Sequence, residues 1–272
     1  MTKLEFDNQK YEIQKIVFQG EKITVRAFEN IVYVEKPVDE IQKLNIYVPE
    51  EYYQGKTIHG YDIHSAPILM PNTVGGYMPG KSIRPGQPIF HKDDVMFKGL
   101  QHGYVIVSAG IRGRGLENKI GCAPACVVDY KAAVRYLRYN KNKIADNCEK
   151  IISNGTSAGG ALSSLLGSTG NHPDYEPYLQ KLGAANERDD IFGASCYCPI
   201  TNLDHADMVY EWEFSGLNDY IRIRHLPNHE VEKIEGQLTD EQIKMSQELK
   251  LLFTDYFNDL NLQKIVICTV NL

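Results

Sequence analysis

The chain has 272 residues, of which 43% are hydrophobic and 24% are charged, so it is long enough to bury one large core. Its formal net charge of −6 at pH 7 argues against a protein that binds nucleic acid by electrostatics. No apolar run approaches the ~18 residues that a membrane-spanning helix needs, and the first ten residues lack the apolar core of a secretory signal. We therefore expect a cytoplasmic protein with no membrane or nucleic-acid partner.

The first part of the chain predicts antiparallel strands. Residues 1–20 are polar with scattered apolar positions and fit an extended lead-in or an edge strand. Between residues 22 and 48, apolar and polar side chains alternate, which is typical of half-buried strands at a sheet edge.

The middle of the chain then alternates strands and helices. Four runs are apolar throughout, as are strands buried on both faces of a parallel sheet: residues 66–71, 104–110, 151–154 and 192–200. Residues 126–139 place apolar side chains three and four positions apart, which predicts an amphipathic helix packed on the sheet. A helix-forming run, residues 161–166, also follows the third strand. This order indicates an α/β fold with a mostly parallel sheet and helices on both faces.

Residues 155–159, Gly-Thr-Ser-Ala-Gly, lie between the third strand and its helix. A G-x-S-x-G segment in this context predicts a nucleophile elbow, a sharp turn that exposes the Ser157 hydroxyl at the sheet edge. The turn also directs the first backbone N–H groups of the helix toward the atoms that the serine attacks. The alternative is a turn of small residues that serves only tight packing.

The loop after the first apolar strand carries Gly75 and Gly76. In a fold of this kind this loop supplies a second backbone N–H to an oxyanion hole, and glycine lets the backbone approach a ligand closely. Tyr77 is a candidate substrate contact. Arg112 follows the second apolar strand, where it either lines the rim of the site or is simply solvated.

A serine hydrolase also needs a base and an acid after the nucleophile. The histidines after Ser157 are residues 172, 205, 225 and 229, and none follows a final core strand. His205, with Asp204 beside it, lies just after the fourth apolar strand and is the candidate pair, although polar loop histidines explain all four positions.

The last third of the chain has a different pattern of apolar residues. Residues 201–237 show no clear period. Thr239 and Gln242 form a capping-box pattern before apolar residues at helical spacing, so we expect a helix from about residue 239 to 260. Residues 264–272 form a short β-like run.

Six segments together resemble the bacterial tannase group of α/β-hydrolases: PNTVGGYMPG (71–80), GYVIVSAGIRGR (103–114), DYKAAVRYLR (129–138), GTSAGGALSS (155–164), CPITNLDHADM (198–208) and YEWEF (210–214). The likeness covers roughly residues 20–260 in order. It implies an esterase that cleaves galloyl and related phenolic esters, with Ser157 as the nucleophile. It also implies that the backbone N–H groups of Gly76 and Ala158 form the oxyanion hole.

The resemblance implies a division of the chain at the start of a lid. Residues 1–204 are expected to form the N-terminal part of an α/β-hydrolase core, and residues 205–272 the beginning of an inserted helical lid with an atypical tail. The later core strands, with the family's acid and base, have no counterpart, so we expect a truncated chain that retains little activity. The alternatives are a general carboxylesterase and a non-catalytic fragment. We expect a small ester with an aromatic acyl group as the substrate, and no metal or organic cofactor, since this chemistry needs none.

Overall fold

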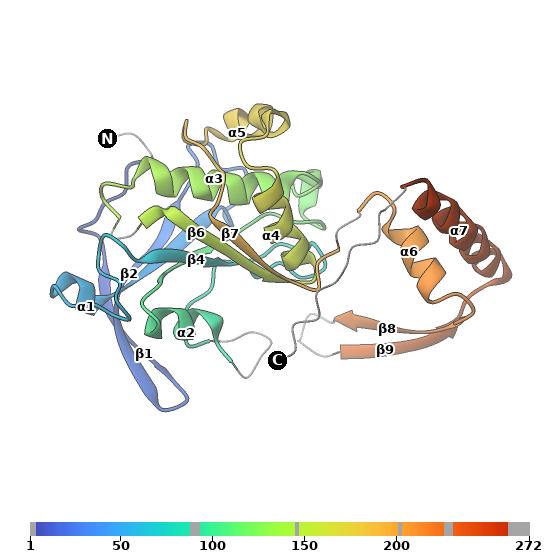
Figure 1. Ribbon diagram of the computed structural model, residues 1–272, viewed down its shortest axis with the longest axis horizontal. Helices are drawn as coiled ribbons and strands as arrows, with labels where there is room; N and C mark the ends of the chain where they lie inside the picture. The colour runs from blue at the N-terminus through green and yellow to red at the C-terminus, as the bar shows by residue number, and fades with distance from the viewer. Residues whose placement is uncertain (1–3, 88–92, 145–146, 201–202, 226–230, 261–272) are drawn as a thin grey trace. The chain divides into compact units, whose positions relative to one another are not determined.

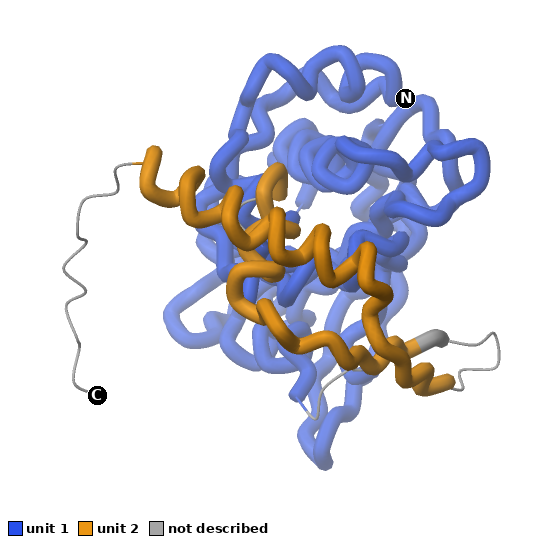
Figure 2. Tube along the Cα trace, turned by 90° about the vertical axis from the view of Figure 1, so that its right-hand side faces the viewer, with its two compact units in different colours: residues 1–201 blue, residues 202–272 orange. Residues whose placement is uncertain are grey.

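The computed structural model describes residues 4–87, 93–144, 147–200, 203–225 and 231–260. The chain forms two compact units, residues 1–201 and residues 202–272, which are described one at a time (Figure 2). Within the described segments, every helix is too short or too polar to cross a membrane. His229 and the β-like run expected at residues 264–272 lie outside the described residues.

The first unit is built on a seven-stranded sheet with the order β1-β2-β3-β5-β4-β6-β7. The strands are β1 (Glu12–Phe18), β2 (Glu21–Val32), β3 (Lys43–Pro49), β4 (Pro67–Pro71), β5 (Val105–Ala109), β6 (Asn147–Thr156) and β7 (Gly193–Tyr197). Strands β1, β2 and β3 pair antiparallel, and β3 also pairs antiparallel with β5. Strand β4 pairs parallel with β5 and β6, and β6 pairs parallel with β7. The predicted antiparallel edge and the predicted parallel strands are both confirmed.

Helices cover both faces of this sheet (Figure 1). The helices of this unit are α1 (Glu50–Tyr53), α2 (Val95–Gln101), α3 (Ala125–Tyr139), α4 (Ala158–Ser168) and α5 (Glu176–Leu182), with short 3₁₀ turns at Glu117–Lys119 and Pro173–Tyr175. Helix α5 packs on α3. Helix α2 lies on one face and α3 and α4 on the other, as Figure 1 shows. The predicted helix over residues 126–139 is confirmed as α3. Helices α1, α2 and α5 are shorter than the window in which periodicity can be recognised, and the sequence did not predict them.

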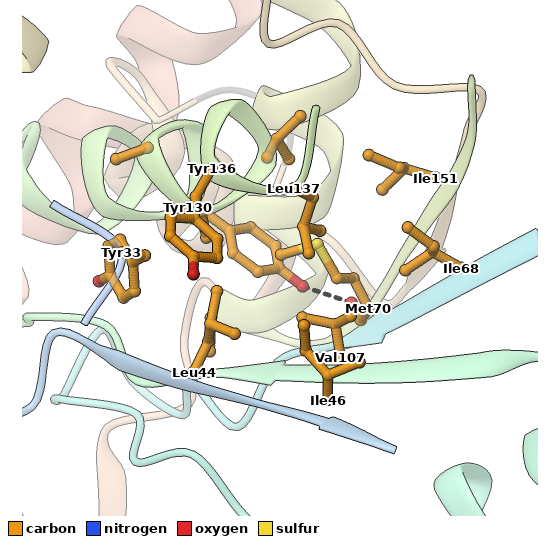
Figure 3. Packing of buried hydrophobic residues seen from close by; sticks show 14 of the residues in the cluster. Tyr33, Leu44, Ile46, Ile68, Met70, Val107, Tyr130, Tyr136, Leu137 and Ile151 are labelled. Atoms are coloured by element: carbon orange, nitrogen blue, oxygen red, sulfur yellow. Dashed lines mark hydrogen bonds between the residues drawn. The ribbon is translucent and has the colours of Figure 1, made fainter. Parts of the chain in front are cut away.

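The core follows from the alternation of side chains along each strand. In β5, Val105 and Val107 join the cluster under α3, whereas Ile106 joins the cluster under α2. Figure 3 shows Tyr130 and Leu137 of α3 packed over strand residues of the first cluster, and the Tyr130 hydroxyl donates a hydrogen bond to the Met70 carbonyl. Because both faces of the sheet are packed, the strands are held firmly, and the loops that follow them start from fixed positions.

A buried charge cluster anchors the segment between α4 and β7. The Asp189 carboxylate accepts hydrogen bonds from Lys131 Nζ at 2.8 Å, from Arg135 Nε at 2.8 Å and from the Asn171 backbone N–H at 2.8 Å. Arg135 also pairs with Glu176 of α5 at 2.8 Å. Because the Asp189 side chain is only 1% exposed and Lys131 is fully buried, each charge depends on its partners for stability.

The second unit contains α6 (Ala206–Glu213), β8 (Asp219–His225), β9 (Val231–Gln237) and α7 (Asp240–Asp259). Thr239 caps α7 and forms the predicted capping box with Gln242. Helices α6 and α7 contact each other through aromatic side chains, with the Trp212 and Phe253 ring centroids 5.4 Å apart. The antiparallel hairpin of β8 and β9 is a correction, because residues 201–237 show no clear period and we expected the start of a helical lid from residue 205.

Candidate active site

Ser157 occupies the turn between β6 and α4 in a strained conformation. Its φ is 58° and its ψ is −123°, a region that side chains other than glycine rarely adopt. Its N–H donates to the Tyr197 carbonyl at 2.9 Å, and its carbonyl accepts the first helical hydrogen bond from Ala161 at 2.9 Å. These bonds hold a conformation that costs about 1–3 kcal/mol, and such strain is concentrated at functional sites. The side chain itself is exposed.

The glycines around Ser157 are required by crowding. A Cβ on Gly155 would lie 2.2 Å from the Gly159 carbonyl oxygen, and one on Gly160 would lie 2.5 Å from the Tyr197 carbonyl oxygen. A Cβ on Gly159 would lie 2.8 Å from the Val74 carbonyl oxygen. Strand, helix and neighbouring loop therefore meet closely enough to exclude any side chain, which is the steric requirement of a nucleophile elbow.

Ala158 is the first residue of α4 and is only 2% exposed. The first N–H groups of a helix have no acceptor within the helix, and they carry the positive end of its dipole. The Ala158 N–H is therefore a suitable donor to a negative oxygen formed next to Ser157.

The loop from residue 72 to 80 holds Gly76 at a φ of 55° and Tyr77 at a φ of 57°. It is paired with the segment after β5: the Gly80 N–H donates to the Ile111 carbonyl at 3.0 Å, and the Ile111 N–H donates back at 2.7 Å. Gly76 is exposed, whereas the Tyr77 ring is half-buried against the core cluster under α3. A role of Tyr77 as a substrate contact stays a prediction.

The two arginines after β5 have different environments. Arg112 is 8% exposed, and its guanidinium binds Asp129 of α3 through contacts of 2.7 and 2.9 Å. Burial raises the pKa of the Asp129 carboxyl, and the hydrogen bonds and charge of Arg112 oppose this rise. Arg112 thus serves in a buried ion pair and is not simply solvated, and its place at the rim of the site stays a prediction.

Arg114 is the arginine that contacts the loop of Gly76. Its Nε donates to the Gly76 carbonyl at 2.5 Å, and its backbone N–H donates to the Tyr77 carbonyl at 2.7 Å. These two bonds hold the two peptide groups that follow Gly76, Gly76–Tyr77 and Tyr77–Met78, and so restrain the loop on the C-terminal side of Gly76. Arg112 and Arg114 lie two positions apart in one loop, so only the structure distinguishes their roles.

A pocket with a volume of about 300 Å³ adjoins Ser157. Apolar side chains supply part of its wall, among them Val74, Ile83 and Met96, and Asp93 and Asp94 also line it. Asp94 is buried and caps α2 by accepting hydrogen bonds from the N–H groups of Met96 and Phe97, so it serves the helix. An exposed serine that lines a mostly apolar pocket is the arrangement expected for attack on a bound ester.

The expected acid and base belong to the second unit. His205 is half-buried, precedes α6, and lies against Tyr256 of α7 with ring centroids 4.5 Å apart. Asp204 is exposed. The pairing of either residue with Ser157 stays a prediction.

Comparisons with known proteins support the fold. The family model BD-FAE matches residues 75–209, which include the loop of Gly76 and the elbow. A tannin acyl hydrolase solved as a mercury derivative is 45% identical, with a TM-score of 0.90 over 97% of this chain and 58% of its own. The tannase of Fusobacterium nucleatum is 46% identical, with a TM-score of 0.88 over 96% of this chain and 58% of its own. The resemblance to the bacterial tannases is confirmed. The fold is that of the α/β-hydrolases.

A tannin acyl hydrolase solved in complex with ethyl gallate is also 45% identical, with a TM-score of 0.88 over 97% of this chain and 57% of its own. The chain thus spans somewhat more than half the length of the tannases that it matches. No curated protein matches it.

Proposed function

We propose that the chain is a serine esterase that hydrolyses esters of phenolic acids, such as galloyl esters, through an acyl-enzyme on Ser157. The observation that carries the proposal is the conformation of Ser157: a strained, exposed serine enclosed by three glycines that accept no side chain. The similarity to tannases, one of them in complex with ethyl gallate and another with 3,4-dihydroxybenzoate, supports an aromatic acyl group.

In the proposed reaction, Ser157 Oγ attacks the ester carbonyl carbon and gives its proton to a base. The carbonyl oxygen becomes an oxyanion, which accepts hydrogen bonds from the backbone N–H groups of Gly76 and Ala158. Collapse of this intermediate breaks the bond to the alcohol, which leaves with a proton. Water then attacks the acyl-enzyme by the same route and releases the acid. Preorganised donors of this kind are worth about 10²–10³ in rate for each donor.

A fluorophosphonate probe tests the nucleophile. It should form one covalent adduct on the full chain, located at Ser157 by peptide mass spectrometry. Ser157→Ala should abolish the adduct, because no other serine in the described part of the chain has a positive φ. Ser168→Ala, which changes an exposed serine at the end of the same helix, is the matched control and should label at the wild-type rate. A folded wild-type chain, judged by circular dichroism, that takes up no probe would refute the proposal and leave a non-catalytic fragment.

The base is tested separately. If His205 accepts the proton of Ser157, then His205→Ala should lower the labelling rate by about 10²-fold or more. His172→Ala is the control, because His172 is exposed in the turn before α5. An unchanged rate in His205→Ala would reject the Asp204–His205 pair and leave the nucleophile assignment untouched.

The acyl group is tested by comparing substrates. Hydrolysis of methyl gallate and of methyl acetate, which share the same alcohol, should be measured on the same preparation. A higher kcat/KM for the galloyl ester supports the proposed class. A preference for the acetyl ester would favour the alternative of a general carboxylesterase.

A further inference from the structure

Asn72 lies directly after β4, and its side chain donates hydrogen bonds to residues on both sides of the elbow. Its Nδ2 donates to the carbonyl oxygens of Asn154 and Gly159, both at 3.0 Å, and to Ser163 Oγ at 3.1 Å. Its Oδ1 accepts the Val74 N–H at 3.2 Å. One side chain thus connects the end of β6, the first turn of α4 and the loop that leads to Gly76.

These partners decide the orientation of the amide. Nδ2 faces two carbonyl oxygens, which only accept hydrogen bonds, and Oδ1 faces an N–H, which only donates. A rotated amide would place oxygen against oxygen and nitrogen against a donor. The amide also occupies the space that the two glycines of the elbow leave free: a Cβ on Gly155 would lie 2.4 Å from Nδ2, and a Cβ on Gly159 would lie 2.4 Å from Oδ1.

The bonds continue into the interior. Ser163 Oγ, which accepts from Asn72, also accepts a hydrogen bond of 2.7 Å from Ser153 Oγ of β6. Ser153 and Ser163 are both fully buried. Since water does not compete for buried partners, a hydrogen bond lost here is not replaced by solvent.

The geometry points to Asn72 as the positioning residue of the oxyanion hole. This inference rests on the proposed function, in which Gly76 and Ala158 supply the two donors. Gly76 lies four residues beyond Asn72 in a loop, and Ala158 lies next to Gly159, whose carbonyl Asn72 holds. By binding both the Val74 N–H and the Gly159 carbonyl, Asn72 sets the distance between the two N–H groups before any substrate arrives. The residue touches no reacting atom and acts only through these backbones.

The test is the reaction of Asn72→Asp with the fluorophosphonate, whose phosphoryl oxygen takes the place of the oxyanion. Aspartate has the same shape but no donor, and it places a negative oxygen against two carbonyl oxygens. Progress curves at several probe concentrations give the maximal labelling rate kinact and the half-saturating concentration KI. Asn72 also lines the pocket beside Ser157, and aspartate keeps the size of the side chain there. We expect kinact to fall about 10- to 100-fold while KI stays within about threefold, because the displaced backbone donors act on the transition state.

Asn140→Asp is the matched control. Asn140 is a buried asparagine whose Nδ2 donates to the Leu4 and Tyr136 carbonyls at 2.9 and 3.0 Å, and whose Oδ1 accepts the Phe6 N–H at 2.9 Å. It therefore has the same bonding pattern at the far end of α3. Its variant should lower the melting temperature and leave kinact unchanged, which separates lost stability from a displaced oxyanion hole.

If Asn72→Asp does not fold, Asn72→Ala measured below its melting temperature replaces it, with an expected fall in kinact of about 5- to 20-fold. Wild-type kinact in a folded Asn72 variant overturns the inference and leaves the proposed function standing. A wild-type chain that is not labelled at Ser157 overturns the proposed function, and the inference with it.

Discussion

The two units differ in how their apolar side chains are used. In residues 1–201, the strands and helices bury their apolar faces against one another, and several of the largest side chains, Tyr33, Tyr47 and Tyr130 among them, are fully buried. In residues 202–272, Ser246 is the only buried residue among the described side chains, whereas Trp212 is 50% exposed. Both units contain helices with apolar side chains at regular spacing. Such spacing predicts that an element forms, but not what covers it.

This contrast can be measured because Trp212 is the only tryptophan of the chain. Tryptophan fluorescence therefore reports on the second unit, whereas far-ultraviolet circular dichroism is dominated by the larger first unit. We expect the urea transition followed by Trp212 fluorescence to occur at a lower urea concentration, and with a smaller m-value, than the transition followed by circular dichroism. The m-value scales with the surface that unfolding exposes, and the second unit is the smaller one.

The largest effect should come from the buried charge cluster. Asp189→Asn keeps the shape of the side chain, but it leaves the buried Lys131 cation without its counter-ion and the Arg135 cation with Glu176 alone. We expect the free energy of unfolding of the first unit to fall by about 3–5 kcal/mol, measured by urea titration followed by circular dichroism. The Trp212 transition should keep its midpoint.

Asp190→Asn is the control for this change. The Asp190 side chain is 37% exposed and pairs with the exposed Arg188 at 2.6 Å and with the buried Arg138 at 3.3 Å. Because solvent reaches the Asp190 carboxylate and screens its charge, we expect a smaller loss than in Asp189→Asn. Equal losses in Asp189→Asn and Asp190→Asn would mean that burial of the cluster does not determine its contribution.

Gly159→Ala should have the next largest effect. The added Cβ would lie 2.4 Å from Asn72 Oδ1 and 2.8 Å from the Val74 carbonyl oxygen. The clashing Val74 atom belongs to the backbone and cannot rotate away, so the loop itself must move. We expect this to lower the free energy of unfolding of the first unit by about 1–3 kcal/mol. Labelling of Ser157 should slow as well. Gly193→Ala in β7 is the control, since its Cβ would have no neighbour within 4 Å; a similar loss in both variants would contradict the steric argument.

How far the sequence predicts the site depends on the distance between the interacting residues. The elbow at Ser157 is local: the turn and its glycines lie within a few residues, so the pattern is visible in the sequence. The different roles of Arg112 and Arg114 depend on Asp129, which lies 17 positions after Arg112, and no local pattern reports such a contact. Asn72 lies just before Gly75 and Gly76 in the same loop, but its partners Gly159 and Ser163 lie 87 and 91 positions away. Its role could therefore not be predicted from a local pattern.

The same reasoning applies to the fold. The parallel strands were predictable because burial on both faces requires continuous apolar runs. The hairpin of β8 and β9 was missed although Ile221 and Ile223 alternate with arginine, because the alternation is short and lies among exposed residues. The capping box of Thr239 was predicted correctly because all of its atoms lie within one helical turn.

A smaller effect is expected from pH. Burial raises the pKa of the Cys126 thiol to about 11 from an ordinary value of 9.0, and its Sγ donates a hydrogen bond to the Arg112 carbonyl at 2.9 Å. In the unfolded chain the thiol ionises near its ordinary pKa, whereas the folded chain keeps the proton. The stabilisation is therefore complete below about pH 9 and is lost as the pH rises from about 9 to 11, by about 1–2 kcal/mol.

The difference between wild type and Cys126→Ala isolates this contribution, since all other groups titrate in both proteins. The difference in the free energy of unfolding, measured by circular dichroism, should decline over that pH range. Cys122→Ala removes an exposed thiol and should show no such decline. A constant difference for Cys126→Ala across the range would show that the thiol ionises alike in the folded and unfolded chains.

The smallest effect should come from the second unit. Ser246 Oγ of α7 donates to Glu211 Oε2 of α6 at 2.5 Å, and this is the one buried side chain described there. Ser246→Ala should shift only the Trp212 transition, by about 0.5–1 kcal/mol, because solvent can replace part of the hydrogen bond to a half-exposed carboxylate. Thr254→Ala, which removes an exposed hydroxyl bonded within α7 itself, should shift it less. A loss of several kcal/mol in Ser246→Ala, or a shift of the circular dichroism transition, would mean that the second unit is as tightly interlocked as the first.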